Sequence, residues 1–412
     1  METVIDNKTV NKYPAYKHSG VEWIEDVPSH WEVKKFKRVF FELKKRSNPE
    51  LNCGSISFGK VVYKDDEKIP ESTKKSYQVV KKGDFLVNPL NLNYDLISLR
   101  IALSDIDVVV SSGYIVLSNS VKLDKTFYKY FLHRFDVAFM KLLGSGVRQT
   151  LNWNDIANCD LIFPPIPEQT AIAAFLDRKT ALIDQAIGIK QKQIELLKKR
   201  RQILIHKAVT RGLNPNVKMK DSGVEWIGEI PEDWEVKRFK FLCDITTGSK
   251  NTEDKVENGL YPFYVRSQTP ERINSYTFEG EAILTAGDGA GVGKVFHYLN
   301  EKFDFHQRVY KFSNFKNIKG KLLFYFLQNN FHNVALNGEA KSTVDSLRLP
   351  LIQNFQVPLP SDYEQTKIIE HIENLTTKIA TAISLKDQEI EKLKEYKATL
   401  INSAVTGKIK VC

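Results

Sequence analysis

The sequence has few cysteines and no long apolar run. Its four cysteines, among 412 residues, are scattered and form no Cys-x-x-Cys pair, which argues against a zinc ribbon or a disulfide framework and fits reduced thiols. No apolar stretch approaches the ~18 residues that a membrane span needs. The first residues lack the basic-then-apolar pattern of a signal peptide. We therefore expect a cytoplasmic protein without a membrane partner.

The sequence also lacks the motifs of common reaction centres. In the glycine-rich stretch 285–297 the P-loop pattern fails, because Asp288 and Val295 stand where Gly and Ser or Thr are needed. The closest histidine pair, His297 and His306, has no neighbouring cysteine, so metal ligation is not expected. Neither a G-x-S-x-G elbow nor an N-P-P-F/Y or D-P-P-F/Y tetrapeptide of amino-methyltransferases is present. We expect no catalytic residue and no cofactor or metal bound by this chain.

Positive charge is only mildly in excess, with 60 basic and 50 acidic side chains and a net charge of +10. This balance permits a nucleic-acid partner without proving one. The excess is uneven: residues 168–211 carry 10 basic and 4 acidic side chains, whereas residues 212–363 carry 18 and 19. The run Lys198-Lys199-Arg200-Arg201 has three possible roles, which the sequence leaves open. It faces DNA, it docks a partner subunit, or it is a solvated helix face.

What the sequence does contain is a long internal repeat. The segment SGVEWIEDVPSHWEVKKF at 19–36 returns as SGVEWIGEIPEDWEVKRF at 222–239, identical at 12 of 18 positions. The motif PIPEQT at 165–170 returns as YEQT at 363–366, and each copy leads into a segment that ends in Ala-Val-Thr. The order A-B-A′-B′ is a two-unit duplication, too large for a solenoid, and predicts a molecule with pseudo-twofold symmetry.

Both B segments have the apolar spacing of a coiled coil. Steps of three and four form an a/d seam, and Gly212 and Gly407 supply plausible helix ends. Because two matched copies can pair with each other, we expect two long antiparallel helices. The expected seam residues are Ile183, Ile187, Ile194, Leu197 and Leu204 in the first copy, and Ile379, Ile383, Ile390, Leu393 and Leu400 in the second.

The A segments mix short β-branched runs with a few helical stretches. Candidate strands lie at 108–110, 114–117, 282–285 and 308–312, and candidate helices at 125–132 and 319–328. The predicted fold class is α+β (mixed α/β), with two globular domains joined by two long coiled-coil helices. The expected boundaries are 1–165 for domain 1, 166–211 for helix 1, 212–362 for domain 2 and 363–412 for helix 2.

Polar loops near the domain ends carry side chains suited to reading base edges. Arg and Lys can donate to guanine, and Asn and Gln can pair with adenine, although each loop also fits an ordinary polar surface. The glycine-rich stretch 285–297 either presents Lys294 to a DNA phosphate or is a simple hairpin. Trp23, Trp31, Trp226 and Trp234 lie in the most faithful repeat, which favours structural anchoring over base stacking. The candidate DNA-binding residues are Arg148, Gln149, Asn152, Arg266, Gln268, Lys294, Arg308, Lys341 and Ser342.

The A-B-A′-B′ order, the SGVEWI opening with its P..WEV continuation, and the PPIPEQ start of a long helix resemble the specificity subunit of type I restriction-modification enzymes. The stretches NGLYPFYVRSQ, GEAILTAGDGAGVGKVFHY, FDFHQRVYKF and AKSTVDSLRLP also resemble one recurrent target-recognition domain of that family. The resemblance implies two target-recognition domains, at 1–165 and 212–362, each reading one half of a bipartite, asymmetric double-stranded DNA site. It implies that the helices fix the spacer between the halves.

The resemblance further implies a subunit without chemistry of its own. It would recruit two methyltransferase (M) subunits, which methylate adenine with S-adenosylmethionine, and two restriction (R) subunits, which use ATP and Mg. Divergence between 40–163 and 240–357 fits two domains that read different half-sites. Two other readings stay open: a nuclease or ATPase with an unfamiliar centre, and a stand-alone regulator or structural coiled-coil protein.

Overall fold

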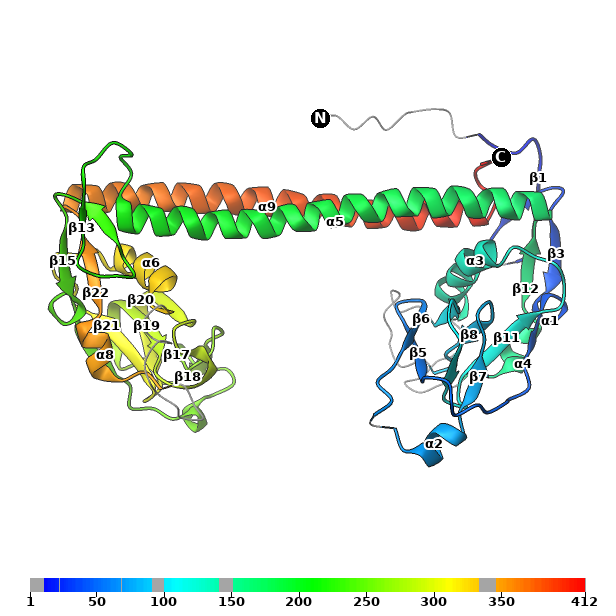
Figure 1. The fold of residues 1–412 in the computed structure, drawn as a ribbon, viewed down its shortest axis with the longest axis horizontal. Helices are drawn as coiled ribbons and strands as arrows, with labels where there is room; N and C mark the ends of the chain where they lie inside the picture. Colours follow the sequence, from blue (N-terminus) through cyan, green and yellow to red (C-terminus); the bar gives the residue numbers. More distant parts are fainter. Residues whose placement is uncertain are drawn as a thin grey trace. The chain divides into compact units, whose positions relative to one another are not determined.

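The computed structural model describes residues 11–21, 23–67, 69–90, 100–140, 151–332 and 346–411. The chain forms two compact units. Unit 1 comprises Met1–Ile189 and Glu389–Cys412, and unit 2 comprises Lys190–Gln388. The boundaries expected from the sequence lie at the ends of the long helices. By packing, each unit instead contains one globular part and about half of each long helix (Figure 1).

Two long helices pass through both units, α5 (Ile166–Arg211) and α9 (Asp362–Val405). In unit 1 the beginning of α5 shares a core with the end of α9, and Lys397 Nζ lies 2.7 Å from Asp184 Oδ2 across the pair. In unit 2 the end of α5 shares a core with the beginning of α9. Within each unit the helix segments are therefore antiparallel, as the sequence predicts.

The apolar positions of α5 and α9 divide into a sheltered and an exposed set. All ten expected seam residues are buried or half-buried. Other apolar side chains of α5 are open to solvent: Leu182, Ile189, Leu196 and Ile203 are 56, 52, 56 and 65% exposed. Each helix ends before a glycine with left-handed backbone, Gly212 at φ 70° and Gly407 at φ 74°, which a residue with a Cβ adopts only at a cost.

The globular part of unit 1 begins and ends with paired strands and holds a small antiparallel sheet between them. The outer pairs are β1 (Tyr16–His18) with β2 (Asp26–Pro28), and β3 (Glu32–Lys35) with β12 (Asp160–Phe163). The inner sheet has the order β4 (Phe40–Glu42), β11 (Ile115–Asn119), β8 (Phe85–Val87) and β9 (Ile101–Leu103). Two further antiparallel pairs are β5 (Gly54–Ser57) with β6 (Lys60–Tyr63), and β7 (Gln78–Val80) with β10 (Val108–Val110).

Helix α3 (Lys125–Ala138) supplies half of the buried aromatic side chains in the core of unit 1. Asp124 caps its N-terminus by accepting hydrogen bonds from the backbone N–H groups of Thr126 and Phe127. Its buried aromatic face packs with residues of the sheet and of α5 in one cluster. The remaining helices are short: α1 (Phe36–Val39), α2 (Glu71–Lys75) and α4 (Trp153–Ala157).

Unit 2 repeats the outer frame around a different interior. The outer pairs are β13 (Met219–Asp221) with β14 (Glu229–Pro231), and β15 (Glu235–Arg238) with β22 (Gln356–Leu359). The inner sheet has six strands in the order β16 (Asp244–Thr247), β21 (Val309–Ser313), β19 (Phe278–Ala286), β20 (Phe296–Phe305), β17 (Tyr261–Tyr264) and β18 (Glu271–Ile273). Strands β17 and β20 pair in parallel, and the other pairs are antiparallel.

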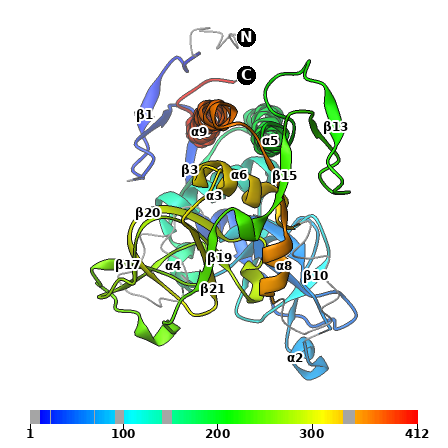
Figure 2. The same ribbon diagram turned by 90° about the vertical axis from the view of Figure 1, so that its left-hand side faces the viewer.

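Helix α6 (Gly320–Asn330) lies between this sheet and the long helices (Figure 2). The shorter helical turns of unit 2 are η2 (Phe239–Phe241), η3 (Thr252–Asp254), η4 (Gly289–Gly291) and α8 (Leu349–Asn354). The predicted α+β class with long helices is confirmed, and the candidate strands and helices correspond to β10, β11, β19, β21, α3 and α6. Among the described residues, none of the helices is both long enough and apolar enough to cross a membrane.

Candidate nucleic-acid interface

The two most faithful sequence motifs contact each other in both units. Trp31 donates from its indole Nε1 to Glu168 Oε2 at 3.0 Å, and Trp234 donates to Glu364 Oε2 at 3.1 Å. Both tryptophans are completely buried. Each opening motif is thus tied to the Glu-Gln pair at the start of a long helix, which confirms that these tryptophans are structural anchors.

The glutamine of each Glu-Gln pair also contacts the globular part of its unit. Gln169 Oε1 accepts from the backbone N–H of Asp124 at 2.9 Å, and Gln365 Oε1 accepts from that of Lys319 at 2.8 Å. Those two residues are the N-caps of α3 and α6. The repeated motifs therefore position one helix of each unit, α3 or α6, on a long helix.

The other tryptophan in each copy of the repeated motif packs on a phenylalanine ring. Trp23 lies 5.6 Å from Phe131, and Trp226 stacks on Phe355 with ring centroids 5.2 Å apart. These packing contacts indicate a structural role for Trp23 and Trp226 as well.

The glycine-rich stretch 285–297 is the turn of a hairpin. It joins β19 to β20, which pair antiparallel from Phe278↔Phe303 to Thr285↔Phe296, with the short turn η4 between them. Lys294 is exposed at this turn and donates its backbone N–H to Gly291. The backbone of this stretch is therefore the hairpin that the sequence allowed. Contact between the exposed Lys294 and an anion stays a prediction.

Two of the predicted DNA-binding arginines meet at this hairpin. Arg266 Nη1 donates to Asp288 Oδ1 at 2.9 Å, and Arg308 Nη1 donates to Asp288 Oδ2 at 2.7 Å. The Asp288 side chain is 10% exposed, whereas those of Arg266 and Arg308 are 44% and 62% exposed. We call these three residues the arginine clamp. A buried carboxylate here holds two guanidinium groups at the surface of unit 2.

Two histidines lie beside the arginine clamp. His306 Nδ1 accepts the backbone N–H of Arg308 at 3.0 Å, and burial, followed by the positive charge of Arg266, lowers its pKa. His297 Nε2 lies 3.1 Å from the carbonyl oxygen of Ser267, and burial lowers its pKa as well. Both rings are therefore neutral at pH 7 and add hydrogen-bonding capacity without charge.

Gln268 and Asn152 are two further candidate DNA-binding residues within the described part of the chain. Gln268 is exposed two residues beyond Arg266, in the loop between β17 and β18. In unit 1 Asn152 is exposed and caps α4, accepting the backbone N–H of Asn154 at 2.9 Å. Arg148, Gln149, Lys341 and Ser342 lie outside the described residues. DNA contact by all of these residues stays a prediction.

Sequence reasoning missed the acidic member of the clamp. Asp288 is separated from Arg266 by 22 residues and from Arg308 by 20, so no local pattern links them. In the sequence Asp288 only marks the failure of a P-loop pattern. The contact arises because Ala286 at the end of β19 pairs with Val309 at the start of β21, while Tyr264 at the end of β17 pairs with Phe305 at the end of β20.

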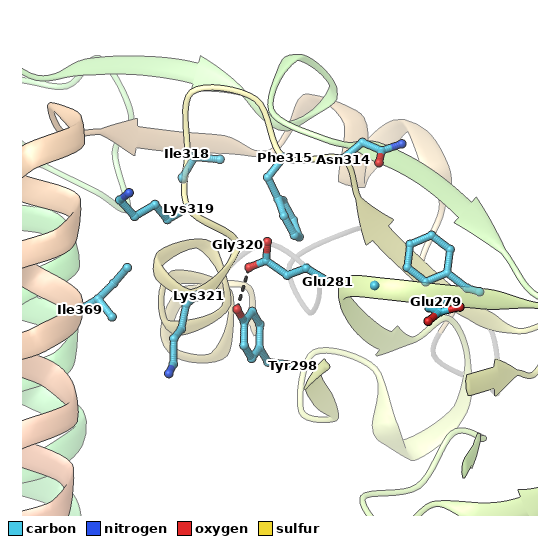
Figure 3. Close-up of a pocket in the computed structure, with 12 residues that line it drawn as sticks. Glu279, Glu281, Tyr298, Asn314, Phe315, Ile318, Lys319, Gly320, Lys321 and Ile369 are labelled. Atoms are coloured by element: carbon cyan, nitrogen blue, oxygen red, sulfur yellow. Dashed lines mark hydrogen bonds between the residues drawn. The ribbon is translucent and has the colours of Figure 1, made fainter. Parts of the chain in front are cut away.

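Unit 2 also contains a hollow with a structural role. It encloses about 530 Å³ between the sheet, the start of α6 and Ile369 of α9 (Figure 3). Tyr298 donates to Glu281 Oε1 at 2.6 Å, and the lysines at its edge are paired with acidic residues of α9. One such pair is Lys321 with Glu373, whose hydrogen bond raises the pKa of the lysine. Its charged groups thus fasten the sheet domain to α9.

Comparison with protein families agrees with the duplicated frame. A family model described as the type I restriction modification DNA specificity domain matches residues 28–199 and, a second time, residues 231–395. The chain belongs to this family. Each match takes in one recognition unit and most of the long helix that follows it, so the repeated unit of the family is the A-B pair recognised in the sequence.

Two named relatives are similar to all or part of this chain. The type I restriction enzyme MjaVIII specificity subunit of Methanocaldococcus jannaschii is 26% identical over 418 aligned positions, covering 93% of this chain and 94% of the relative. The type I restriction enzyme EcoDI specificity subunit of Escherichia coli is 29% identical over 182 positions, covering 44% of this chain and 40% of the relative.

Solved structures show the same fold at low identity. A chain from a study of complex assembly and conformational transition of the type I R-M system matches with a TM-score of 0.68 at 16% identity, over 92% of this chain and 98% of that chain. The HsdS subunit of Thermoanaerobacter tengcongensis matches with a TM-score of 0.53 at 16% identity, over 93% and 98%. These likenesses extend over both recognition units and both long helices.

Proposed function

We propose that this specificity subunit reads a bipartite, asymmetric site in double-stranded DNA, one half with each unit, and performs no chemistry of its own. The observation that carries the proposal is the contrast between frame and interior. Both units have the same outer strand pairs and the same Trp-Glu anchor, yet one holds a four-stranded sheet and the other a six-stranded sheet. A shared frame with unlike interiors suits two domains that contact different base sequences.

The long helices would set the spacer between the two half-sites. Helix α5 has 46 residues and α9 has 44, and each unit contains a segment of both. An α-helix rises ~1.5 Å per residue, against ~3.4 Å per base pair along a DNA strand. The seam residues Ile183, Ile187, Ile194, Leu197 and Leu204, with their α9 counterparts, keep the helices in register in this proposal.

An exposed apolar row on α5 supports recruitment of partner subunits. Leu196 and Ile203 are 56% and 65% exposed in unit 2, and the segment of α5 in unit 1 carries Leu182 and Ile189 at the same heptad position. Basic residues flank this row, as Lys198, Lys199 and Arg200 are exposed in the next turn. A row of this kind fits an amphipathic helix of a methyltransferase subunit.

The proposal assigns the chemistry of the complex to its partners. Two methyltransferase subunits would carry S-adenosylmethionine and methylate adenine, and two restriction subunits would use ATP and Mg. The specificity subunit would act with them on cytoplasmic DNA. Among its described residues, the arginine clamp and Lys294 serve binding.

The test is assembly and DNA binding with the partner subunits. The full chain, co-expressed with its cognate methyltransferase subunit, should elute with it in size-exclusion chromatography and bind one DNA sequence in competition with random duplex. Purified alone, the chain should hydrolyse no ATP. A chain that turns over ATP by itself, and loses this with Lys294→Ala, would be an enzyme, and a chain that never co-elutes with the methyltransferase would be a separate regulator.

A further inference from the structure

The arginine clamp is built on a backbone segment with several hydrogen bonds. Gly287 donates its backbone N–H to the Arg308 carbonyl oxygen and accepts the backbone N–H of Leu347, and Asp288 itself forms a β-bridge with Ser346. The backbone that carries the carboxylate is therefore hydrogen-bonded to two other segments of unit 2. Through their bonds to this carboxylate, the guanidinium groups of Arg266 and Arg308 are held in defined positions.

The clamp leaves most donors of both arginines for a ligand. A guanidinium has five N–H donors and no acceptor, and the bond to Asp288 occupies one of them in each arginine. The side chains remain 44% and 62% exposed. The complementary ligand therefore offers paired acceptors: in DNA these are a phosphate, or the O6 and N7 atoms of guanine.

Charge distinguishes these two ligands. Phosphate binding needs positive charge more than fixed planes, and a carboxylate beside it is unfavourable. Here Asp288 cancels one of two positive charges, and the lowered pKa of His306 keeps that ring neutral. Residues 212–363, which include this surface, carry 18 basic and 19 acidic side chains. The clamp thus has the orientation that base reading requires and little of the charge that phosphate binding favours.

We propose that Arg266 and Arg308 read guanine in the half-site bound by unit 2, with Asp288 as the residue that positions them. This inference rests on the proposed function, in which unit 2 reads one half of a bipartite site. Asp288 contacts no base in this proposal and acts through the two arginines.

The experiment uses the full chain assembled with its methyltransferase subunits. The methylated motif in genomic DNA first defines both half-sites. Equilibrium binding then compares the affinity for the cognate duplex with that for altered duplexes. In each altered duplex one guanine of the unit 2 half-site is replaced by 7-deazaguanine or by adenine. One bidentate contact gives about 10- to 100-fold discrimination. Asp288→Asn and Arg308→Ala should reduce this discrimination toward none at the same base pair, and leave the unit 1 half-site unchanged.

Two further variants separate orientation from charge and from folding. Arg308→Lys keeps the charge without the planar fork, so it should retain binding to random duplex and lose guanine discrimination. Glu279→Gln removes an acidic side chain paired with Lys302 on the same sheet, and should leave discrimination intact. Because Arg308→Lys tests the same contact with little structural change, misfolding of one variant leaves the inference testable.

Three results would overturn the inference. A unit 2 half-site without guanine would refute it while the proposed function stands. A uniform loss of affinity for all sequences, with a smaller salt dependence, would make the arginines phosphate contacts. Equal losses at both half-sites in Asp288→Asn would mean a purely structural role. By contrast, absence of any sequence preference in the unaltered complex would refute the proposed function itself.

Discussion

The indole Nε1 of Trp31 lies 3.0 Å from Oε2 of Glu168 and donates a hydrogen bond to it. This contact joins the opening motif of unit 1 to the first turn of α5. The same carboxylate accepts from the Tyr13 hydroxyl at 2.9 Å and lies 2.6 Å from His30 Nε2. In unit 2 the corresponding Glu364 accepts from Trp234 and from the Ser361 hydroxyl. Unit 1 thus concentrates more partners on its anchor.

Removing the anchor carboxylate should destabilise unit 1. Glu168→Ala leaves the buried indole N–H of Trp31 without an acceptor, which costs about 2 to 3 kcal/mol for a hydrogen bond to a charged group. Glu364→Ala, the matched change in unit 2, should cost less because fewer groups share that carboxylate. Urea unfolding followed by tryptophan fluorescence measures both. Equal midpoints for the two variants and the unaltered chain would contradict the anchor role.

Acid should weaken the same anchor. Burial raises the pKa of Glu168, but hydrogen bonds from His30, Trp31 and Tyr13 outweigh it and leave the pKa below its usual value of 4.5. A lowered carboxylate pKa gives stability that is present above pH 4.5 and lost as pH falls through the folded-state pKa. The stability difference between the unaltered chain and Glu168→Gln should therefore shrink below pH 4.5. A difference that stays constant down to pH 3 would argue against this linkage.

A strained hairpin turn offers a stabilising substitution. Phe58 has φ 47° and is 85% exposed, and Gly59 follows it at φ 73° in the turn between β5 and β6. Left-handed backbone costs ~1 to 2 kcal/mol for a bulky residue, whereas Asn-Gly suits this turn. Phe58→Asn should raise the free energy of unfolding by about 0.5 to 1 kcal/mol. Phe58→Ala is the control, since it removes the ring and keeps the strain. No gain relative to alanine would contradict the strain.

The exposed row of α5 predicts a selective defect in assembly. Leu196→Glu with Ile203→Glu places two charges in a proposed helix interface, so co-elution with the methyltransferase subunit should be lost. Leu260→Glu is a matched control, because Leu260 is a 71% exposed apolar residue elsewhere in unit 2. Thermal unfolding of the isolated chain should be nearly unchanged in both. Full co-elution of the double variant would mean that partners dock elsewhere.

The frame of this molecule follows from local and repeated patterns. Apolar spacing marked the seam from Ile183 to Leu204, and Gly212 and Gly407 marked the helix ends. β-branched runs such as Val108–Val110 became strands because their side chains fill a buried sheet position. These features depend on residues close in sequence, or on two copies that can be compared.

The arginine clamp follows from contacts that no local pattern encodes. The order of the six-stranded sheet, with β17 parallel to β20, brings Arg266, Asp288 and Arg308 together across more than 40 residues of chain. Both arginines were predicted as DNA contacts from residue type alone. Their common carboxylate depends on strand pairing, which is why the sequence predicted two unconnected candidates and the structure shows one clamp.

The most direct test of the account is the methylated motif in genomic DNA from cells that express this subunit with its partners. We predict a bipartite motif with a modified adenine in each half and a fixed, unread gap. Four residues inserted after Leu197 in α5 and after Leu393 in α9 should lengthen that gap by one or two base pairs, because four residues add ~6 Å of helix. A contiguous motif, or a gap that ignores the insertion, would contradict the account.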